Sequence, residues 1–375
     1  MAVYDAIVIG SGGVGSAALS HLARRGGRVL GIDRFRAPHD RGSSHGQSRI
    51  VRQAYFEHDN YVPLLVESYR QWAELEALAQ KKLVNQVGVL QIGPVDGIVV
   101  PGVLHAAMRH GLKVEQLSAE TVQERWPALR VADQLVGVLE ANAGYLAVEA
   151  CVEAHLRAAQ QCGAELRYGV EVHRWDPSQP LLLHTSDGEL RTRRLIITPG
   201  AWAGDLLADL PVDFQIRRKS MFWYAPKQSQ ESVMESPPVF LFELPEGIFY
   251  GLPQIEADGV KLAEHSGGQI VEDPLTVDRE VFPDDAARIE AFLSKCLPHV
   301  SLSQLRHEVC LYTMTPDEHF IVDRHPDCPD VVFAAGLSGH GFKFAPVLGQ
   351  ALADLALESA TELPIEFLSL KRFDR

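Results

Sequence analysis

The stretch that decides the fold is Asp5-Ala-Ile-Val-Ile-Gly-Ser-Gly-Gly-Val-Gly-Ser16, together with Gly27-Arg-Val-Leu-Gly-Ile-Asp33 further along the chain. Residues 6–9 form a short apolar run, as expected for a strand that is buried on both faces. After the glycines, apolar residues recur at helical spacing, and residues 28–32 again favour a strand. The pattern predicts a strand–helix–strand unit with a glycine-rich turn after its first strand.

Gly10, Gly12 and Gly15 form the pattern G-x-G-x-x-G, which is typical of a dinucleotide site when a strand precedes it and a helix follows. The glycines allow a tight turn, approach of the backbone to a pyrophosphate and close helix–strand packing. The helix N-terminus supplies N–H groups for the phosphates. Asp33 follows at close to the spacing of about 20 residues expected for an acid that binds ribose hydroxyls. A tight turn without a ligand would explain the glycines but not Asp33.

Composition narrows the class of protein. The chain has 375 residues, of which 46% are hydrophobic and 22% charged, as in an ordinary soluble globular protein that is long enough for two domains. The net charge of −14 argues against nucleic-acid binding, which needs a basic surface. No apolar stretch is long enough to span a membrane, and the first strand begins at once, so we expect no signal peptide.

The cysteines and histidines indicate the compartment of the protein and whether it binds a metal. The five cysteines are odd in number and include no C-x-x-C pair, so we expect neither a disulfide framework nor a zinc site. The histidines show no H-E-x-x-H pattern, and we expect no bound metal. A cytoplasmic location fits these features best.

The remaining pattern predicts an α/β fold in two domains. Helical or strand-like runs that belong with the first unit occupy residues 61–78, 149–162, 165–168, 194–197, 331–335 and 346–357. Short runs at close spacing, which indicate an antiparallel or mixed sheet, occupy residues 219–224, 239–242, 248–252 and 260–263. We predict a Rossmann-like nucleotide-binding domain from residues 1–85, 148–215 and 320–375. Residues 86–147 and 216–319 form an inserted mixed-sheet substrate domain.

A second glycine-rich loop lies near the end of the chain, in Gly336-Leu-Ser-Gly-His-Gly-Phe-Lys-Phe-Ala-Pro-Val-Leu-Gly349. It leads into an apolar helix, so it also presents backbone N–H groups at a helix N-terminus. Such a loop can cradle the electron-rich N1–C2=O edge of a flavin, and Lys343 would stabilise the reduced, anionic ring. A glycine-rich turn with a solvated lysine is the alternative.

Six further motifs are His45-Gly-x-x-Arg49-x-x-Arg52, Gly247-Ile-Phe-Tyr250-Gly, Lys261-x-x-x-His265, Val309-Cys310-Leu-Tyr312-Thr, Asp317-Glu-His-Phe-Ile-Val-Asp323 and Gly339-His-Gly-Phe-Lys343. In these motifs the chain resembles the flavin-dependent amine oxidases that include monomeric sarcosine oxidase and N-methyl-L-tryptophan oxidase. The resemblance covers essentially the whole chain, and the tail and residues 265–269 look closer to N-methyl-L-tryptophan oxidase. It implies that the nucleotide is FAD.

The resemblance also implies how FAD is held. By itself, a cysteine in an apolar strand is typical of a core residue, but Cys310 matches the family's covalent attachment to the 8α-methyl group of the flavin through a thioether. The expected cofactor-binding residues are Gly10, Gly12, Val14, Gly15, Asp33, Arg34, Ser43, His45, Arg49, Cys310, Gly339, Gly341, Phe342 and Lys343.

The same resemblance implies which residues bind the substrate and take part in its oxidation. Arg52 and Lys343 match the family's clamp for a substrate carboxylate, one as a bidentate fork and the other as a point charge. Lys261 is expected over the flavin face, where its charge would stabilise the superoxide that forms when O2 takes an electron. The other residues expected to act in catalysis or to line the substrate pocket are Arg49, Tyr250, His265, Tyr312 and Leu241. His340 is expected to be structural.

The implied activity is oxidative demethylation of an N-methyl amino acid with O2, giving the amino acid, formaldehyde and H2O2. Ser44, Gln47, Gln53 and Glu264 depart from residues common in the family and leave the substrate side chain open. A cyclic imino acid such as pipecolate fits the clamp equally well. The alternatives are a flavin dehydrogenase that uses another acceptor, a non-catalytic FAD-binding module and an NAD-dependent dehydrogenase.

Overall fold

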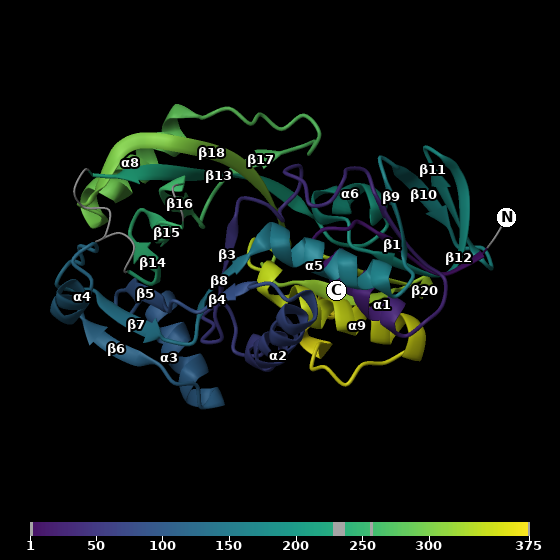
Figure 1. Ribbon diagram of the computed structural model, residues 1–375, viewed down its shortest axis with the longest axis horizontal. Helices are drawn as coiled ribbons and strands as arrows, with labels where there is room; N and C mark the ends of the chain where they lie inside the picture. The colour runs from purple at the N-terminus through teal and green to yellow at the C-terminus, as the bar shows by residue number, and fades with distance from the viewer. Residues whose placement is uncertain (1–2, 228–236, 256–257, 374–375) are drawn as a thin grey trace.

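The computed structural model describes residues 3–227, 237–255 and 258–373. Two large sheets dominate it. Figure 1 shows α1, α5 and α9 gathered beside the first sheet, whereas the long strands β13 and β18 lie with α8 at the other end of the molecule. Within the described residues, no helix combines the length and the apolar character needed to cross a membrane.

The first sheet contains the predicted strand–helix–strand unit. β1 pairs in parallel with β2 on one side and with β12 on the other. β9 continues the parallel order beyond β2, and β20 continues it beyond the C-terminal half of β12. In sheet order the strands are β10 (Val172–Asp176), β11 (Leu181–Thr185), β12 (Gly188–Ile197), β1 (Val3–Ile9), β2 (Val29–Asp33) and β9 (Glu165–Tyr168), with β20 (Cys328–Ala335) beside β12 and β19 (Ile321–His325) beside β20.

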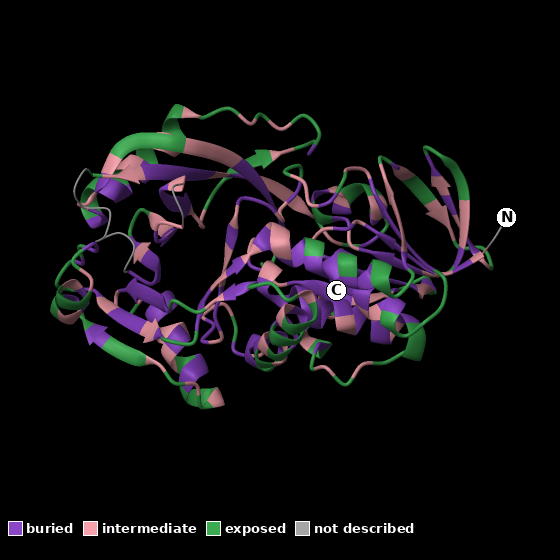
Figure 2. Cartoon of the chain, viewed as in Figure 1, coloured by how far each residue is buried: buried purple, intermediate pink, exposed green. Residues whose placement is uncertain are grey.

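Both faces of this sheet are buried. Ala6 and Val8 of β1 belong to the apolar cluster formed with the helices, whereas Ile7 and Ile9 belong to a second cluster on the opposite face. α1 packs against both α5 and α9, and Figure 2 shows α5 with one exposed and one buried side. The helices around the sheet are α1 (Gly13–Arg24), α2 (Tyr61–Ala79), α5 (Val148–Gln161), α6 (Ala203–Leu206) and α9 (Ala345–Glu358), with the 3-10 turns η1 (Gly200–Trp202), η3 (Phe342–Phe344), η4 (Glu366–Leu368) and η5 (Leu370–Phe373).

The second sheet is mixed and has two chemically different faces. In order its strands are β17 (Gln269–Val271), β13 (Gln215–Pro226), β16 (Val260–Glu264), β15 (Gly247–Leu252), β14 (Val239–Leu244), β5 (Val89–Gly93), β7 (Val136–Glu140) and β6 (Glu115–Ser118), with β18 (Val300–Met314) paired to β13. Because side chains alternate along a strand, Phe222 and Tyr224 of β13 pack into a core that includes residues of α8 (Pro283–Cys296). Met221 and Trp223 instead join Cys310 and Tyr312 on the opposite face.

Smaller elements complete the fold. β8 (Gly144–Ala147) lies between β3 (Ser48–Val51) and β4 (Val84–Asn85) in a short antiparallel sheet. The helix α3 (Val99–His110) contacts β5 and β7 of the second sheet, and α4 (Ala119–Arg125) contacts β6 and β7. The predicted α/β fold with a glycine-rich turn and a mixed sheet is confirmed. The exact division of the chain into two domains stays a prediction.

Candidate active site

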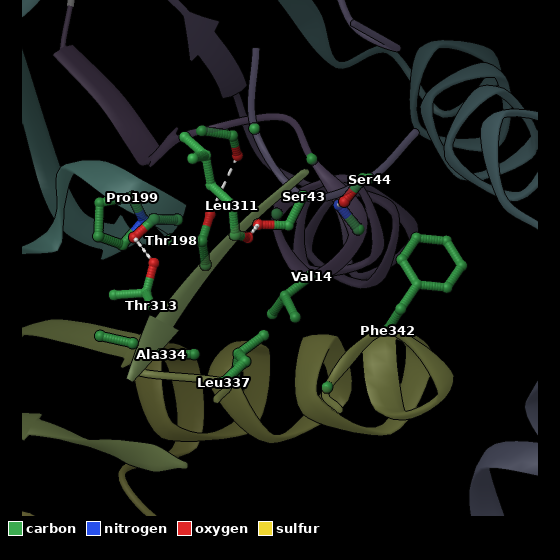
Figure 3. Close-up of a pocket in the computed structure, with 18 of the residues that line it drawn as sticks. Val14, Ser43, Ser44, Thr198, Pro199, Leu311, Thr313, Ala334, Leu337 and Phe342 are labelled. Atoms are coloured by element: carbon green, nitrogen blue, oxygen red, sulfur yellow. Dashed lines mark hydrogen bonds between the residues drawn. The ribbon is translucent and has the colours of Figure 1, made fainter. Parts of the chain in front are cut away.

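A cavity of about 460 Å³ is lined by residues of both large sheets, a volume within the usual range for ligand sites. Its wall contains the turn after β1, the end of β2, the chain before β3, the pocket-facing side of β18 and the loop before α9. Figure 3 shows Val14, Leu337 and Thr313 around this space, from α1, the loop after β20 and β18 respectively. Segments that are far apart in the sequence therefore form one site.

The turn after β1 is shaped for a close ligand. Gly10 has a φ of +88°, and a Cβ at this position would lie 2.2 Å from the carbonyl oxygen of Thr198. A Cβ on Gly15 would lie 1.8 Å from the oxygen of Gly10. Gly12 caps α1 without a side-chain hydrogen bond. The turn is therefore packed tightly against the rest of the sheet, and it lines the cavity at the N-terminus of α1, where a pyrophosphate would bind.

Asp33 lies at the edge of the same turn. Its two carboxylate oxygens accept hydrogen bonds from the backbone N–H groups of Ser11 at 2.7 Å and Phe35 at 2.9 Å. Each carboxylate oxygen has a second lone pair, so Asp33 can still accept from a ribose hydroxyl. Arg34 also lines the cavity and forms an ion pair with Glu171.

Cys310 lines the cavity and is 2% exposed. Nη2 of Arg49 lies 3.4 Å from its Sγ and also donates to the carbonyl oxygen of Ser43 at 2.7 Å. Cys310 therefore lines the cavity beside a guanidinium that is itself held by the backbone of Ser43.

Lys261 is buried behind this part of the wall and is not among the lining residues. Its Nζ donates to the carbonyl oxygens of Gly46 at 2.5 Å and Ser48 at 2.9 Å. Nη1 of Arg49 donates to the same Ser48 oxygen at 2.8 Å. Burial, followed by the charge of Arg49, lowers the pKa of Lys261 well below its usual value. Lys261 therefore contacts backbone oxygens behind the pocket wall and not the cavity itself. Its position over the flavin stays a prediction.

Arg52 lines the cavity but already has a partner. Its Nη2 donates to both carboxylate oxygens of Glu57, at 2.6 and 2.8 Å, and its Nη1 donates to the oxygen of Ala54 at 3.2 Å. Burial alone would raise the pKa of Glu57, but the charge of Arg52 and its cationic neighbours lowers it to about 2. Glu57 also lines the cavity but was not among the predicted site residues. It follows Arg52 by five residues in a loop, and this spacing by itself indicates no contact.

Lys343 lies beside this pair. Its Nζ donates to the carbonyl oxygen of His340 at 2.6 Å, and it lies 3.4 Å from the hydroxyl of Tyr55. Burial, and then the charge of Arg52, lowers the pKa of Lys343 to about 7. Two cations and one carboxylate therefore meet at this end of the cavity, which leaves one excess positive charge when Lys343 is protonated.

Aromatic and polar groups form the rest of this end. Tyr250, His265, Tyr312 and Leu241 all line the cavity. Nδ1 of His265 lies 3.5 Å from the hydroxyl of Tyr312. Burial lowers the pKa of His265 to about 4, so its imidazole is neutral at neutral pH. Burial likewise raises the pKa of Tyr250.

All but two of the predicted site residues line the cavity, the exceptions being Lys261 and His45. Nδ1 of His45 lies 3.0 Å from Oε2 of Glu308, outside the lining. His340, expected to be structural, lines the cavity and contacts the hydroxyl of Tyr55 through Nδ1. Lining residues that the sequence analysis did not single out include Phe56, Val170, His173, Thr198, Trp202 and Leu206.

Within the described ranges, one group of side chains has metal-ligand spacing. Ligand atoms of Asp209, His325 and Asp327 lie within 4.8 Å of one another, away from the cavity. Nε2 of His325 is 2.9 Å from Oδ2 of Asp209, so a His–Asp contact accounts for this group without an ion.

Comparison with known proteins identifies the family. The family described as FAD dependent oxidoreductase matches residues 5–355. The chain belongs to this family of FAD-dependent oxidoreductases. Monomeric sarcosine oxidase of Streptomyces avermitilis is 41% identical, with 98% of this chain and 97% of the relative covered. N-methyl-L-tryptophan oxidase of Citrobacter koseri is 36% identical, with 99% of each chain covered. The structure of NikD, an amino acid oxidase, matches with a TM-score of 0.87 at 24% identity over 98% of each chain.

One sequence prediction needs correction. The tail suggested a closer likeness to N-methyl-L-tryptophan oxidase, but over the full chain the sarcosine oxidase of S. avermitilis has the higher identity. A short motif reports only the residues within it, whereas identity over the chain averages all positions. The site itself fits FAD, because Gly10 and Gly15 give the tight turn and the close packing of helix on strand that a dinucleotide site requires, and Oδ2 of Asp33, which accepts from Ser11, has a second lone pair for a ribose hydroxyl.

Proposed function

We propose that the protein oxidises the secondary amine of an N-methyl amino acid with O2. The substrate loses two electrons and two protons to O2, which gives H2O2 and an imine. Water then hydrolyses the imine to the primary amino acid and formaldehyde. The observation that carries this proposal is the meeting of Arg52 and Lys343 in the cavity that also contains Cys310 and the glycine-rich turn.

FAD, when bound, supplies the acceptor for the electrons of the substrate C–H bond and passes them to O2. The chain supplies binding and electrostatics. We propose that Gly10, Gly12, Gly15 and Asp33 would hold the dinucleotide and that Cys310 would hold the flavin through a thioether, with Arg49 beside the sulfur. The relatives support the FAD dependence, and the contact between Arg49 and Cys310 supports the covalent bond.

Arg52 and Lys343 would bind the substrate carboxylate and thereby place the N-methyl group for reaction, a positioning effect. For this to happen the fork of Arg52 must exchange Glu57 for the substrate. The neutral imidazole of His265 and the hydroxyls of Tyr250 and Tyr312 would surround the substrate amine, and none of them carries a positive charge that would repel it. Lys261 would supply positive charge where O2 is reduced.

The names of the relatives support this class of substrate, since both sarcosine and N-methyl-L-tryptophan are N-methyl amino acids. We also propose that the protein is a monomer in the cytoplasm. The names of the sarcosine oxidase relatives include the word monomeric, and all five cysteines are free, as a reducing compartment requires.

The test is peroxide release, under air, from a panel of sarcosine, N-methyl-L-tryptophan, other N-methyl amino acids, pipecolate and a simple N-methyl amine. For each N-methyl amino acid that reacts, the amount of formaldehyde should equal the amount of peroxide. Peroxide from pipecolate alone would make the protein an oxidase of cyclic imino acids. Flavin bleaching without peroxide would make it a dehydrogenase. Equal activity on the simple amine would show that no substrate carboxylate is needed and would exclude the proposed clamp of Arg52 and Lys343.

A further inference from the structure

A third buried lysine, after Lys261 and Lys343, lies near the substrate end of the site and has no role in the proposed reaction. Lys219 of β13 is 5% exposed and does not line the cavity. Its Cα partner across the antiparallel pair is Cys310 of β18, so the two side chains lie on the same face of the sheet. Its Nζ also lies 5.4 Å from the ring centroid of Tyr312.

The lysine binds a tight turn. Its Nζ donates to the carbonyl oxygens of Ser266 at 2.6 Å and Gly267 at 3.2 Å. Gly268 has a φ of +107°, and a Cβ there would lie 2.9 Å from Cδ of Lys219, so the turn closes directly over the lysine stem. The residue that enters this turn is His265, which lines the cavity.

The charges around Lys219 come from several elements. Burial lowers the pKa of Lys219 to about 8, while Glu264 raises it and Arg217 lowers it. Asp285 of α8 and Cys310 of β18 also raise it. The nearest carboxylate, Glu264, accepts from Ser266 Oγ at 2.9 Å and pairs with Arg288, so the ammonium depends on the two carbonyl oxygens of the turn for its hydrogen bonds.

We infer that Lys219 is a positioning residue that clamps residues 265–268 and thereby fixes His265 at the substrate end of the cavity. An ammonium holds two carbonyl oxygens more strongly than a neutral amine does, because a charged donor forms stronger hydrogen bonds. The clamp is therefore intact below about pH 8 and weakens above it. Burial lowers the pKa of Lys343 to about 7, so its deprotonation is a separate event at lower pH than that of Lys219.

The kinetic test rests on the proposed function and uses sarcosine. K219M should raise KM about tenfold at pH 7, as expected for the loss of one charged hydrogen bond, with kcat within about twofold. In the wild type we expect a rise in KM with a midpoint near pH 8, and this rise should be missing in K219M, whereas any rise near pH 7 from Lys343 should remain. K219R should keep a low KM to higher pH, because arginine stays charged. E264Q should move the midpoint to lower pH, because Glu264 raises the pKa of Lys219.

The matched control is K295M, which removes an exposed lysine of α8 paired with Glu246; it should leave every parameter unchanged. A K219M enzyme with the wild-type KM and pH profile would overturn the inference. A fall in kcat with KM unchanged would also overturn it.

A second readout needs no substrate. The flavin absorption of the substrate-free holoenzyme should change with a midpoint near pH 8 in the wild type and not in K219M, because the charge lies beside Tyr312. If no amino acid reduces the flavin, the proposed function fails while this titration still tests Lys219. If K219M does not fold, the profile of K219R decides, since a wild-type midpoint near 8 in that variant contradicts the clamp.

Discussion

The carbonyl oxygen of Ser48 accepts hydrogen bonds from two cations, Arg49 and Lys261. Because Arg49 also reaches the sulfur of Cys310, the proposed attachment point and the proposed oxygen-activating lysine share one backbone group. Cationic side chains this close repel one another, and backbone oxygens offset that repulsion without adding a negative charge. Residues with separate proposed roles are thus linked through single atoms.

Cys310→Ala should release the flavin. In the wild type the yellow colour should stay with the protein after acid precipitation, because a thioether survives it, whereas in the variant it should enter the supernatant. Cys151→Ala, which removes another buried cysteine outside the cavity, is the control and should keep its colour. Complete release of flavin from the wild type would contradict the assignment.

Glu57→Gln should lower KM for N-methyl amino acids by roughly tenfold, which corresponds to about 1.4 kcal/mol. The glutamine retains the shape of Glu57 but no longer competes as an anion for the guanidinium of Arg52. Steady-state kinetics with sarcosine measure the effect, and Glu74→Gln on the exposed face of α2 is the control. A higher KM would instead make Glu57 a ligand for the substrate amine.

Lys261→Met should slow reoxidation of the flavin much more than its reduction. The loss should be roughly 100- to 1,000-fold, as for one preorganised electrostatic group. Stopped-flow measurement of the two half-reactions separates the effects. Because Lys261 also holds the backbone at Gly46 and Ser48, equal slowing of both halves would assign it to the support of β3 alone.

At the scale of elements, apolar periodicity predicted helices and strands that bury an apolar face. The expected helix at residues 61–78 is α2 (Tyr61–Ala79). β18 shows where periodicity fails: it extends over Val300–Met314, but its first half is largely exposed, so only Val309–Thr313 has an apolar pattern. Pairing with β13 along the whole strand, which is a long-range contact, holds the polar half in place.

The loop before α9 gives an element-scale prediction. Gly339 has a φ of +80°, and a Cβ there would lie 2.2 Å from Cε2 of Tyr312. Gly339→Ala should therefore displace Tyr312 and reduce both FAD content and activity. Gly163→Ala is the matched control, since its φ is +89° with no atom within 4 Å of the new Cβ. Both variants carry the backbone cost of roughly 1–2 kcal/mol. Equal FAD content and activity would remove the steric argument.

At the scale of the molecule, the cavity joins the two sheets, with walls that extend from Ile9 to Lys343. The sequence predicted most of these wall residues, because glycine patterns and family motifs are local. It could not predict that Arg52 is paired with Glu57, or that Lys261 lies behind the wall. Both depend on the path of the chain around β3, which short motifs do not encode.

A ligand that contacts both sheets should stabilise the whole fold. The melting temperature of Cys310→Ala should rise with added FAD. Each tenfold increase of the FAD concentration above the dissociation constant should add about 1.4 kcal/mol to the free energy of unfolding. Differential scanning fluorimetry measures this, and NAD should have no effect. The wild type should not respond, because under the proposed covalent attachment its flavin already fills the site. A melting temperature of the variant that ignores FAD would place the cofactor elsewhere.

The alternation along the second sheet also has an evolutionary consequence. Leu241 and Tyr250 face the cavity, whereas their neighbours in sequence, Phe240 and Phe249, pack in the core beside α8. Substitutions at the cavity-facing positions can thus change which amine is accepted while the core beside α8 keeps its side chains. New substrate preferences can therefore arise by single mutations, and in a library confined to the cavity-facing positions the core beside α8 should be intact.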